Sequence, residues 1–338
     1  MKQMVALAVA VAILIPAMPF QLAHSADKAP NENGSEEFAD LPFEITSFGA
    51  ARVGHHALVY GGHNGDAHSY STEEQSNSLL ALDLETSGAQ WEKVAEGDRL
   101  QGLAMVPYKN SVVLIGGFTA MNEKGEDHDL RSRDRVRMFD IVTKNWTELP
   151  SLPAGRSSHD AAIWEDTIYV VGGWQMDGDN ETTWHTSGLK LDLSSEKPSW
   201  EEIKTPPFKR RALAVVAHGG KIYSIGGMDP EKGPTTEVDV YDPATNEWTS
   251  GPALTGEGRM AGFGAAGWSV GGTLLVSTYE GDVLTLSDDG QSWTSNGKTE
   301  DSRFFHRLIP LGSEKVVSVG GANMESGKYL NLEVIAVD

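Results

Sequence analysis

Short apolar runs separated by polar clusters recur along the chain at a nearly constant interval. One kind of run ends in two glycines, as in LVYGG at 58–62 and VLIGG at 113–117. A second kind ends in Asp and leads through a turn to a tryptophan, as in FDIVTKNW at 139–146. Short apolar runs bounded by turn-forming residues are typical of β-strands. The pattern therefore predicts an all-β protein made of repeated units.

The glycine doublets and the tryptophans keep one phase through the chain. The doublets lie at 61–62, 116–117, 172–173, 226–227 and 320–321. The tryptophans are Trp91, Trp146, Trp200, Trp248 and Trp293. Their spacing gives a period of about 50 residues. Six units of four short strands follow, and each unit is predicted to form one antiparallel blade of a six-bladed propeller.

Two units depart from the pattern. The fifth has lost its doublet, because LLVST stands at 274–278, and the sixth stops at LEVIAVD, before the strand that carries the tryptophan. The residues before Leu41 occupy the place of such a strand at the other end of the domain. We predict that the segment around Glu36 to Asp40 pairs beside 332–337 and closes the ring, so that the last blade has no unpaired edge.

The repeat positions are predicted to be structural. The doublet after the second strand lets a neighbouring backbone and the repeat tryptophan approach closely. The five phase-locked tryptophans are expected in the core. Two other doublets, at 219–220 and 271–272, fall between the first and second strands, where a tight hairpin needs positive backbone dihedrals.

The first 25 residues have the layout of a secretory signal peptide. A single charge at Lys2 precedes an apolar run from Met4 to Phe20, and small residues follow at 23–26. We expect cleavage near Ala26, a polar acidic linker at 26–35 and one propeller domain at 36–338. The mature protein is expected in the periplasm or outside the cell, with no membrane insertion after cleavage.

Composition narrows the classes of partner. The chain has 48 acidic and 27 basic residues, a formal net charge of −21, which argues against binding nucleic acid or an anionic membrane. It has no cysteine, so stability must come from the core rather than from disulfides. We expect no cofactor and no metal, because no histidine pair has helical or finger-like ligand spacing.

With the doublets, the Asp-to-Trp hairpins and the Leu-Pro-x-x-Arg segment at 152–156 in register, the chain resembles the kelch-repeat family over about residues 36 to 338. The resemblance implies a six-bladed kelch β-propeller. Within that family, periplasmic N-acetylneuraminate mutarotases are similar in length, signal peptide and blade count, and they act on an anionic sugar. No catalytic residue is carried over from them. Copper enzymes of the galactose-oxidase type are excluded, because their Cys-Tyr crosslink needs a cysteine.

Arginines recur just before the innermost strand of five blades. They are Arg99, Arg156, Arg210, Arg259 and Arg303, while blade one has Ile45 in that place. In a meander this connection lies at the same end as the long loops, so the arginines would ring one mouth of the channel. Arg presents a planar fork matched to carboxylates. We expect this ring to bind an anionic ligand, either a sugar acid or an acidic peptide; the alternative is that the arginines bond to loops between blades.

Long polar loops of blades one to three, at 63–78, 118–134 and 174–187, should surround the same mouth and make any pocket lopsided towards the first half of the chain. Five of their residues are added to the candidate ligand site: Trp174, Trp184, His63, His128 and His185. The two tryptophans could stack on a sugar ring or a partner residue, or fold down over the blade.

Two hypotheses remain open. The first is a non-enzymatic exported binding or interaction module that uses the arginine-bearing face. The second is a carbohydrate-active enzyme of the sialic-acid mutarotase or epimerase type, with a loop carboxylate such as Glu181 as its acid or base. The sequence identifies neither the ligand nor any catalytic residue.

Overall fold

The computed structural model describes residues 37–256, 258 and 260–337, in which strands are the regular elements. The predicted signal peptide and linker lie outside the described residues. No helix in the described part is long and apolar enough to cross a membrane. The described chain forms a compact unit that begins at Phe38.

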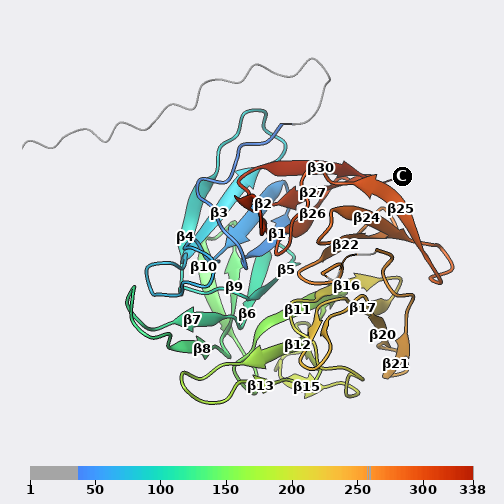
Figure 1. Ribbon diagram of the computed structural model, residues 1–338, viewed down its shortest axis with the longest axis horizontal. Coiled ribbons are helices and arrows are strands. Elements are labelled where there is room, and N and C mark those ends of the chain that lie inside the picture. The colour runs from blue at the N-terminus through green and yellow to red at the C-terminus, as the bar shows by residue number, and fades with distance from the viewer. Residues whose placement is uncertain (1–36, 257, 259, 338) are drawn as a thin grey trace, which may run out of the picture. The chain divides into compact units, whose positions relative to one another are not determined.

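Five sheets have four antiparallel strands in sequence order, and Figure 1 shows them arranged around a central axis. Blade one consists of β1 (Gly49–Val53), β2 (His56–Tyr60), β3 (Ser78–Asp83) and β4 (Glu92–Glu96). Blade two consists of β5 (Ala104–Tyr108), β6 (Ser111–Ile115), β9 (Val136–Asp140) and β10 (Asn145–Leu149). Blade three consists of β11 (Ser157–Trp164), β12 (Thr167–Gln175), β14 (Leu189–Asp192) and β15 (Trp200–Glu202), with β13 (Thr183–Trp184) beside β12.

Blade four consists of β16 (Ala214–His218), β17 (Lys221–Ile225), β20 (Val238–Asp242) and β21 (Glu247–Ser250). Blade five consists of β22 (Ala266–Val270), β23 (Thr273–Ser277), β24 (Asp282–Leu286) and β25 (Trp293–Lys298). Blade six contributes β26 (Arg307–Leu311), β27 (Lys315–Val319) and β30 (Leu332–Ala336). Short hairpins extend three blades: β7 (Phe118–Ala120) with β8 (Leu130–Ser132), β18 (Met228–Asp229) with β19 (Gly233–Pro234), and β28 (Ala322–Asn323) with β29 (Gly327–Lys328).

The chain ends meet in blade six. The N–H of Leu41 donates to the carbonyl of Leu330 at 2.8 Å, as the N–H of Leu152 does to Asp134 in blade two. The indole N–H of Trp91 donates to Ala39, at the repeat position where the indole of Trp200 finds Pro150. The segment before Leu41 therefore occupies the outer-strand position of blade six, as predicted. In the described residues it makes this bond, and Phe38 and Ala39 pack against the same apolar cluster as β30, rather than forming a full strand ladder with it.

Apolar seams between neighbouring blades form the core. In β2, Leu58 and Tyr60 belong to the cluster shared with blade two, and Ala57 and Val59 belong to the cluster shared with blade six. Because both faces of each sheet are buried, the inner strands are continuous apolar runs rather than alternating ones. The innermost strands contact one another in order around the ring, and β26 contacts β1 to complete it.

A series of backbone hydrogen bonds links successive blades where each innermost strand begins. One residue per blade has a left-handed φ between 51° and 62° at this point, and we call these the collar residues: Ser47, Gly102, Ser158, Ala212, Gly264 and Phe305. From Gly102 onward, each collar N–H donates to the collar carbonyl of the preceding blade, at 2.7–3.0 Å. The collar fixes the backbone direction of the segments that lead into the innermost strands.

The glycine doublets couple neighbouring blades, which confirms their predicted packing role. Both glycines of each doublet have positive φ, and a Cβ on Gly116 would lie 2.4 Å from the carbonyl oxygen of Arg156. The N–H of Gly117 donates to that same carbonyl at 2.8 Å. The atoms nearest the doublets belong to backbone and inner-strand side chains, not to the repeat tryptophans, which lie on the outer strands.

The repeat tryptophans are less buried than expected. Trp293 is 7% exposed, whereas the other four are half-buried. Outer strands face solvent on one side, and each of Trp91, Trp200, Trp248 and Trp293 instead uses its indole N–H to bond a carbonyl of the adjoining blade. The doublets at 219–220 and 271–272 have positive φ in their hairpin turns, as predicted.

Candidate functional site

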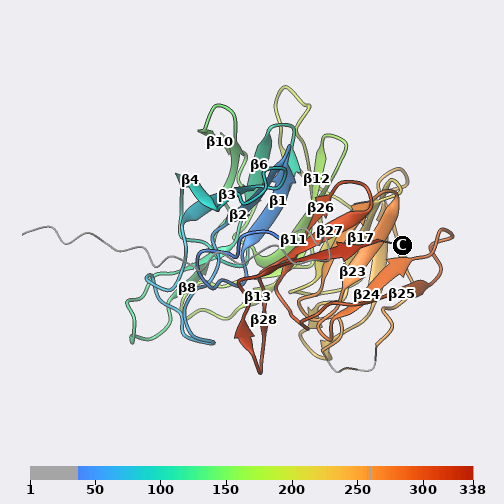
Figure 2. The same cartoon turned by 90° about the horizontal axis from the view of Figure 1, so that it is seen from above.

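One end of the ring gathers the segments that enter the innermost strands and the long loops, as predicted. The bridges Thr46 with His63 and Gln101 with Phe118 join the two sets of segments directly. Figure 2 shows the short strands β8, β13 and β28 projecting at this end. We call the channel opening at this end the mouth.

The four predicted arginines that the structure describes do not form a ring at the mouth. Arg156, Arg210 and Arg303 are 1–2% exposed and lie in the seams, where they bond to carbonyl groups of their own blades. Arg210 also pairs with Asp239. Each of the three stands two positions before its collar residue, where the turned backbone points the side chain between the sheets. Their expected role as a ligand rim is therefore corrected, because they are closed off from solvent.

The two remaining arginines do not occupy that position. In blade two the residue two before the collar is Leu100, and the neighbouring Arg99 is exposed, with Nη1 bonded to the carbonyls of Thr72 and Gln75. In blade five that position is Gly262, and Arg259 lies outside the described residues. The side chains thus scatter between seam and surface.

Burial has opposite effects on the seam cations and their partners. It lowers the pKa of Arg156 to about 10, since no carboxylate of the described residues pairs with that guanidinium. It also lowers the pKa of Arg210 and raises that of Asp239, so desolvation outweighs their mutual attraction. Burial of these charged groups costs folding free energy, and their hydrogen bonds in the seam offset that cost. This is typical of residues with a structural role.

Aromatic side chains from all parts of the ring take the place of the expected cations at the mouth. Tyr70 lies with its ring centroid 5.2 Å from that of His63, 6.0 Å from Phe118 and 5.4 Å from His128. On blade three, Trp174 and Trp184 pack edge to face at 5.4 Å. Both tryptophans thus fold onto one another as well as lining the mouth.

The aromatic lining continues through the second half of the chain. Phe263 lies 6.0 Å from Phe304 and 5.1 Å from Phe305, and Tyr279 stacks on Phe304 at 5.3 Å. The mouth is therefore not lopsided towards blades one to three, although the longest loops are there.

Arg211 is the cation held within this lining. Its guanidinium carbon lies 4.2 Å from the ring centroid of Trp174, 5.8 Å from Trp184 and 5.9 Å from Phe263. The nearest polar contact is the sulfur of Met228, 3.1 Å from Nη2, and Nε has no hydrogen-bond partner. Desolvation lowers the pKa of Arg211. No carboxylate of the described residues lies within 4.0 Å of this guanidinium, unlike that of Arg131, which pairs with Asp129 and Asp177.

The three predicted histidines have different surroundings. His63 is buried, with Nε2 2.7 Å from the carbonyl oxygen of Ser69, and desolvation lowers its pKa. His128 is exposed, and its Nε2 accepts the N–H of Tyr70. His185 lies 2.9 Å from the carbonyl of Gly155, and burial, aided by Arg156, lowers its pKa to about 4. The first two belong to the mouth, whereas His185 belongs to the seam beside Arg156.

Below the mouth, one ion pair spans the channel. Arg307 of blade six reaches Asp160 of blade three at 3.0 Å and the carbonyls of Phe48 and Leu103 at 3.2 and 3.3 Å. Asp160 in turn accepts the N–H of Val215 at 3.0 Å. Five blades are thereby linked across the axis.

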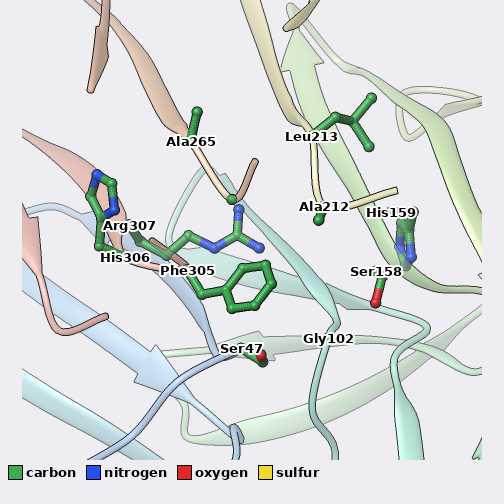
Figure 3. A pocket seen from close by; sticks show the side chains of 11 residues that line it. Ser47, Gly102, Ser158, His159, Ala212, Leu213, Ala265, Phe305, His306 and Arg307 are labelled. Atoms are coloured by element: carbon green, nitrogen blue, oxygen red, sulfur yellow. The ribbon is translucent and has the colours of Figure 1, made fainter. Parts of the chain in front are cut away.

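The cavity beside this pair is small. Its volume is about 60 Å³, and collar residues together with His159, His306 and Arg307 line it, as Figure 3 shows. His159 and His306 are expected from sequence to hydrogen-bond in the channel, but neither ring has a hydrogen-bond partner. Desolvation lowers the pKa of His306 to about 3 and that of His159 well below its usual value. This space is too small for a sugar or a peptide.

Sequence reasoning missed three charged residues of the channel and mouth. Arg211 follows Arg210 directly and is one before the collar, a position whose side chain faces the mouth. Asp160 and Arg307 stand in innermost strands where the other four blades have Gly or Ala, at 49, 104, 214 and 266. A charge at a small-residue position of the repeat is a signal that could have identified them.

Comparison with known proteins gives one family match. The model of the KLHDC2/KLHL20/DRC7 Kelch-repeats domain matches residues 47–278. Among solved structures, that of YjhT superimposes with a TM-score of 0.69 at 15% identity, covering 89% of this chain and 97% of the other. At that identity the likeness concerns the fold.

Curated relatives match parts of the chain. Beta-scruin of Limulus polyphemus is 32% identical over 139 residues, 38% of this chain and 14% of that protein. Kelch-like protein terF of Aspergillus terreus is 29% identical over 157 residues, 45% of this chain and 33% of that protein. Kelch-like protein 36 of Rattus norvegicus is 24% identical over 217 residues, 62% of this chain and 34% of that protein. The matched region spans between 14% and 34% of the length of these relatives.

Proposed function

Since the chain belongs to the kelch-repeat family, whose propellers typically serve as protein-interaction modules, we propose that its mouth binds a partner segment that carries a carboxylate. The aromatic lining would contact apolar groups beside that carboxylate. The observation that carries the proposal is Arg211, a guanidinium held over Trp174 with no acidic partner among the described residues.

The acidic composition of the chain makes the lack of an acidic partner for Arg211 significant. Acidic residues outnumber basic ones by 48 to 27, so most cations here have an acidic neighbour available. An arginine left unpaired in such a chain, and partly desolvated by rings, can form charge-assisted hydrogen bonds that are stronger than those of a solvated cation. Arg133 supports the same reading, because its Nη2 contacts the sulfur of Met121 and it forms no ion pair with the described residues.

The aromatic lining favours a macromolecular partner. Tyrosine, tryptophan and arginine are the residue types that most often dominate binding energy at protein interfaces, especially where they are rigid and desolvated. Around Arg211 they come from several blades, which offers an extended surface. A mutarotase-type site would instead need an acid or base beside the bound carboxylate, and the groups that contact Arg211 are rings and a thioether.

A random heptapeptide display library panned on the protein tests the proposal. We expect enriched peptides to contain Asp or Glu next to an aromatic or aliphatic residue. Replacing the acid with its amide, or making Arg211→Met, should weaken binding at least tenfold in fluorescence polarisation. Arg131→Met is the matched control, because that cation on the same face is already neutralised by Asp129 and Asp177.

Two outcomes would count against the proposal. Equal affinity of Arg211→Met and wild type for the enriched peptides would remove Arg211 as the recognition group. The second outcome is that no peptide binds, whereas N-acetylneuraminic acid raises the melting temperature and Arg211→Met abolishes that shift. The ligand would then be a small sugar acid whose carboxylate binds Arg211.

We further propose that this module acts after export, on the strength of the apolar run at 4–20 and the small residues at 23–26. The mature chain is expected to begin near Ala26. N-terminal sequencing of the protein recovered from its native cell is the measurement, and an intact Met1 would contradict export by this route.

A further inference from the structure

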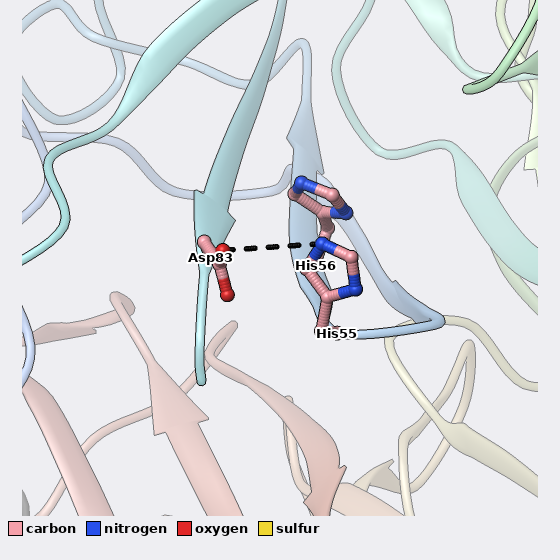
Figure 4. A group of neighbouring side chains, drawn as sticks. All are labelled: His55, His56 and Asp83. Carbon is pink, nitrogen blue, oxygen red and sulfur yellow. Dashed lines mark ion pairs between the residues drawn. The ribbon is translucent and has the colours of Figure 1, made fainter. Parts of the chain in front are cut away.

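A cluster of two histidines and one aspartate lies at the end of blade one opposite the mouth. The hairpin between β1 and β2 carries His55 and His56, and Asp83 ends the neighbouring strand β3. One potential ligand atom from each residue lies within 4.8 Å of the other two. Figure 4 shows the two imidazoles and the carboxylate side by side.

The repeat explains the aspartate but not the histidines. Asp83 accepts the N–H of Glu85 at 2.9 Å, and Asp140 and Asp192 accept N–H groups at the same place in blades two and three. The hairpin positions of His55 and His56 hold different residues elsewhere: Asn110 and Ser111, Asp166 and Thr167, Gly220 and Lys221, Gly272 and Thr273. Blade one therefore adds two imidazoles to a carboxylate that the corresponding turns of blades two, three and four also have.

The geometry suits a transition-metal ion after small side-chain movements. Nε2 of His55 lies 3.9 Å from Oδ2 of Asp83, and the two imidazole centroids are 4.0 Å apart. Ligands of a tetrahedral Zn²⁺ at about 2.0–2.2 Å from the metal stand somewhat closer together than the 4.8 Å limit of this cluster. The side chain of His55 is 48% exposed and that of Asp83 is 30% exposed, so both can turn inward without disturbing the core.

The electrostatic surroundings also favour a cation. Asp83 and Glu92 are the negative neighbours of His56, and they would attract a positive ion to the two imidazoles. Arg52, on β1 of the same blade, is already paired with Glu85 at 3.4 Å and bonded to the carbonyls of Gly54 and Pro310.

We propose that His55, His56 and Asp83 form a binding site for a divalent transition-metal ion such as Zn²⁺, with water completing the coordination. Two imidazole ligands select such ions over Mg²⁺ and Ca²⁺, which prefer all-oxygen sites. The site is separate from the mouth, because β1 runs from the collar to this hairpin. It is therefore independent of the proposed function.

Calorimetric titration of tag-free, EDTA-treated protein with Zn²⁺ tests the site. We expect one ion per chain and at least tenfold weaker binding in His55→Ala and in His56→Ala. His68→Ala is the control, since that histidine is exposed on the loop of blade one but lies outside the cluster, and it should bind as wild type does. Mg²⁺ should give no heat at the same concentrations.

A second measurement keeps the test independent of folding. X-ray absorption of the loaded protein should show two imidazole ligands and low-Z oxygen ligands, and thermal unfolding without zinc should be the same for His55→Ala and wild type. Unchanged zinc affinity in both histidine variants, or the absence of a stoichiometric site in folded wild type, would overturn the proposal. Arg211→Met should leave zinc binding unaltered, which separates this site from the mouth.

Discussion

Arg210 and Arg211 are consecutive in sequence and belong to different regions of the molecule. Arg210, two residues before its collar residue, lies in the seam. It donates hydrogen bonds to the carbonyls of Gly226 and Glu237 and pairs with the carboxylate of Asp239. Arg211, one residue before the collar, lies at the mouth among aromatic rings with no carboxylate partner in the described chain. One step along a turned backbone thus separates a structural cation from the cation that we propose for recognition.

The seam position tolerates very different side chains. It holds Arg156, Arg210 and Arg303 in three blades and Ile45, Leu100 and Gly262 in the other three. The collar is the same in all of them, so the guanidinium is not what closes the ring. Where an arginine is present, it donates hydrogen bonds to carbonyl groups of its own blade. Its removal should therefore lower the free energy of unfolding.

The largest effect that would test this comparison is expected for Arg210→Ala. The change leaves Asp239, 14% exposed in its side chain, without its partner and removes the donors to two carbonyls. Breaking a buried ion pair costs about 3–5 kcal/mol of unfolding free energy. Urea denaturation monitored by tryptophan fluorescence measures it. Arg99→Ala, at an exposed arginine, should cost less than about 1 kcal/mol, and similar losses in the two variants would erase the distinction between seam and surface.

Acid should destabilise the channel through its buried imidazoles. The folded pKa of His306 is about 3, against about 6.5 when unfolded, so below pH 6.5 the unfolded chain binds a proton that the folded one does not. Stability is therefore flat above pH 6.5 and falls as the pH decreases towards 3, by about 3 kcal/mol at pH 4.5 for this one group. His306→Leu should reduce, but not abolish, the pH dependence of urea denaturation in this window, because the pKa values of His159 and His185 are also lowered.

The exposed His128 offers the matched control for that experiment. His128→Leu, at the mouth, shows how much of any change comes from replacing an exposed histidine with leucine. If both leucine variants follow the wild-type curve between pH 6.5 and 4.5, the channel imidazole is not held neutral by burial.

A smaller effect should separate backbone strain from crowding in the seam. Gly117 has φ of 94°, and an added Cβ would lie 2.9 Å from the Cβ of Leu103, so Gly117→Ala should cost about 2 kcal/mol or more. Gly125 has a similar φ of 90° but open space around it, and Gly125→Ala should cost only the strain, about 1 kcal/mol. Thermal unfolding of the two variants makes the comparison, and equal costs would mean that the doublet is required for its φ alone.

The smallest stability effect is expected at the mouth. Arg211→Met removes a cation over Trp174, worth about 0.5–1 kcal/mol, but also a desolvated guanidinium whose Nε is unpartnered. The net change in unfolding free energy should be below about 1 kcal/mol, although ligand binding is lost. A loss comparable to that of Arg210→Ala would place Arg211 among the structural arginines.

The fold was accessible from sequence because its signal is periodic. Every doublet and tryptophan falls where the repeat places it, and the register of Ala39 and Leu41 against blade six follows from the same phase. The site was harder to predict from sequence, since the arginine is displaced from its repeat position by one residue in blade two and by more in blade five. A shift of one residue is enough to move an arginine side chain from the seam to the mouth. The direction of a side chain at a left-handed turn cannot be predicted from a pattern of residue types.

Charges within the channel show the same limit. Asp160 and Arg307 are separated by 147 positions, and only ring closure brings their strands to opposite walls. Their pairing depends on three-dimensional geometry that no local motif encodes. The aromatic lining likewise draws single residues from several loops of unequal length, so no window of the sequence contains it.

The collar has a consequence for how such a protein can change over evolutionary time. Its bonds use main-chain groups only, and its six members range from glycine and alanine through serine to phenylalanine without loss of the bonds that link successive blades from one to six. Side chains there and one step earlier can therefore diversify while the architecture persists, which gives the propeller a set of interchangeable positions for acquiring new specificities.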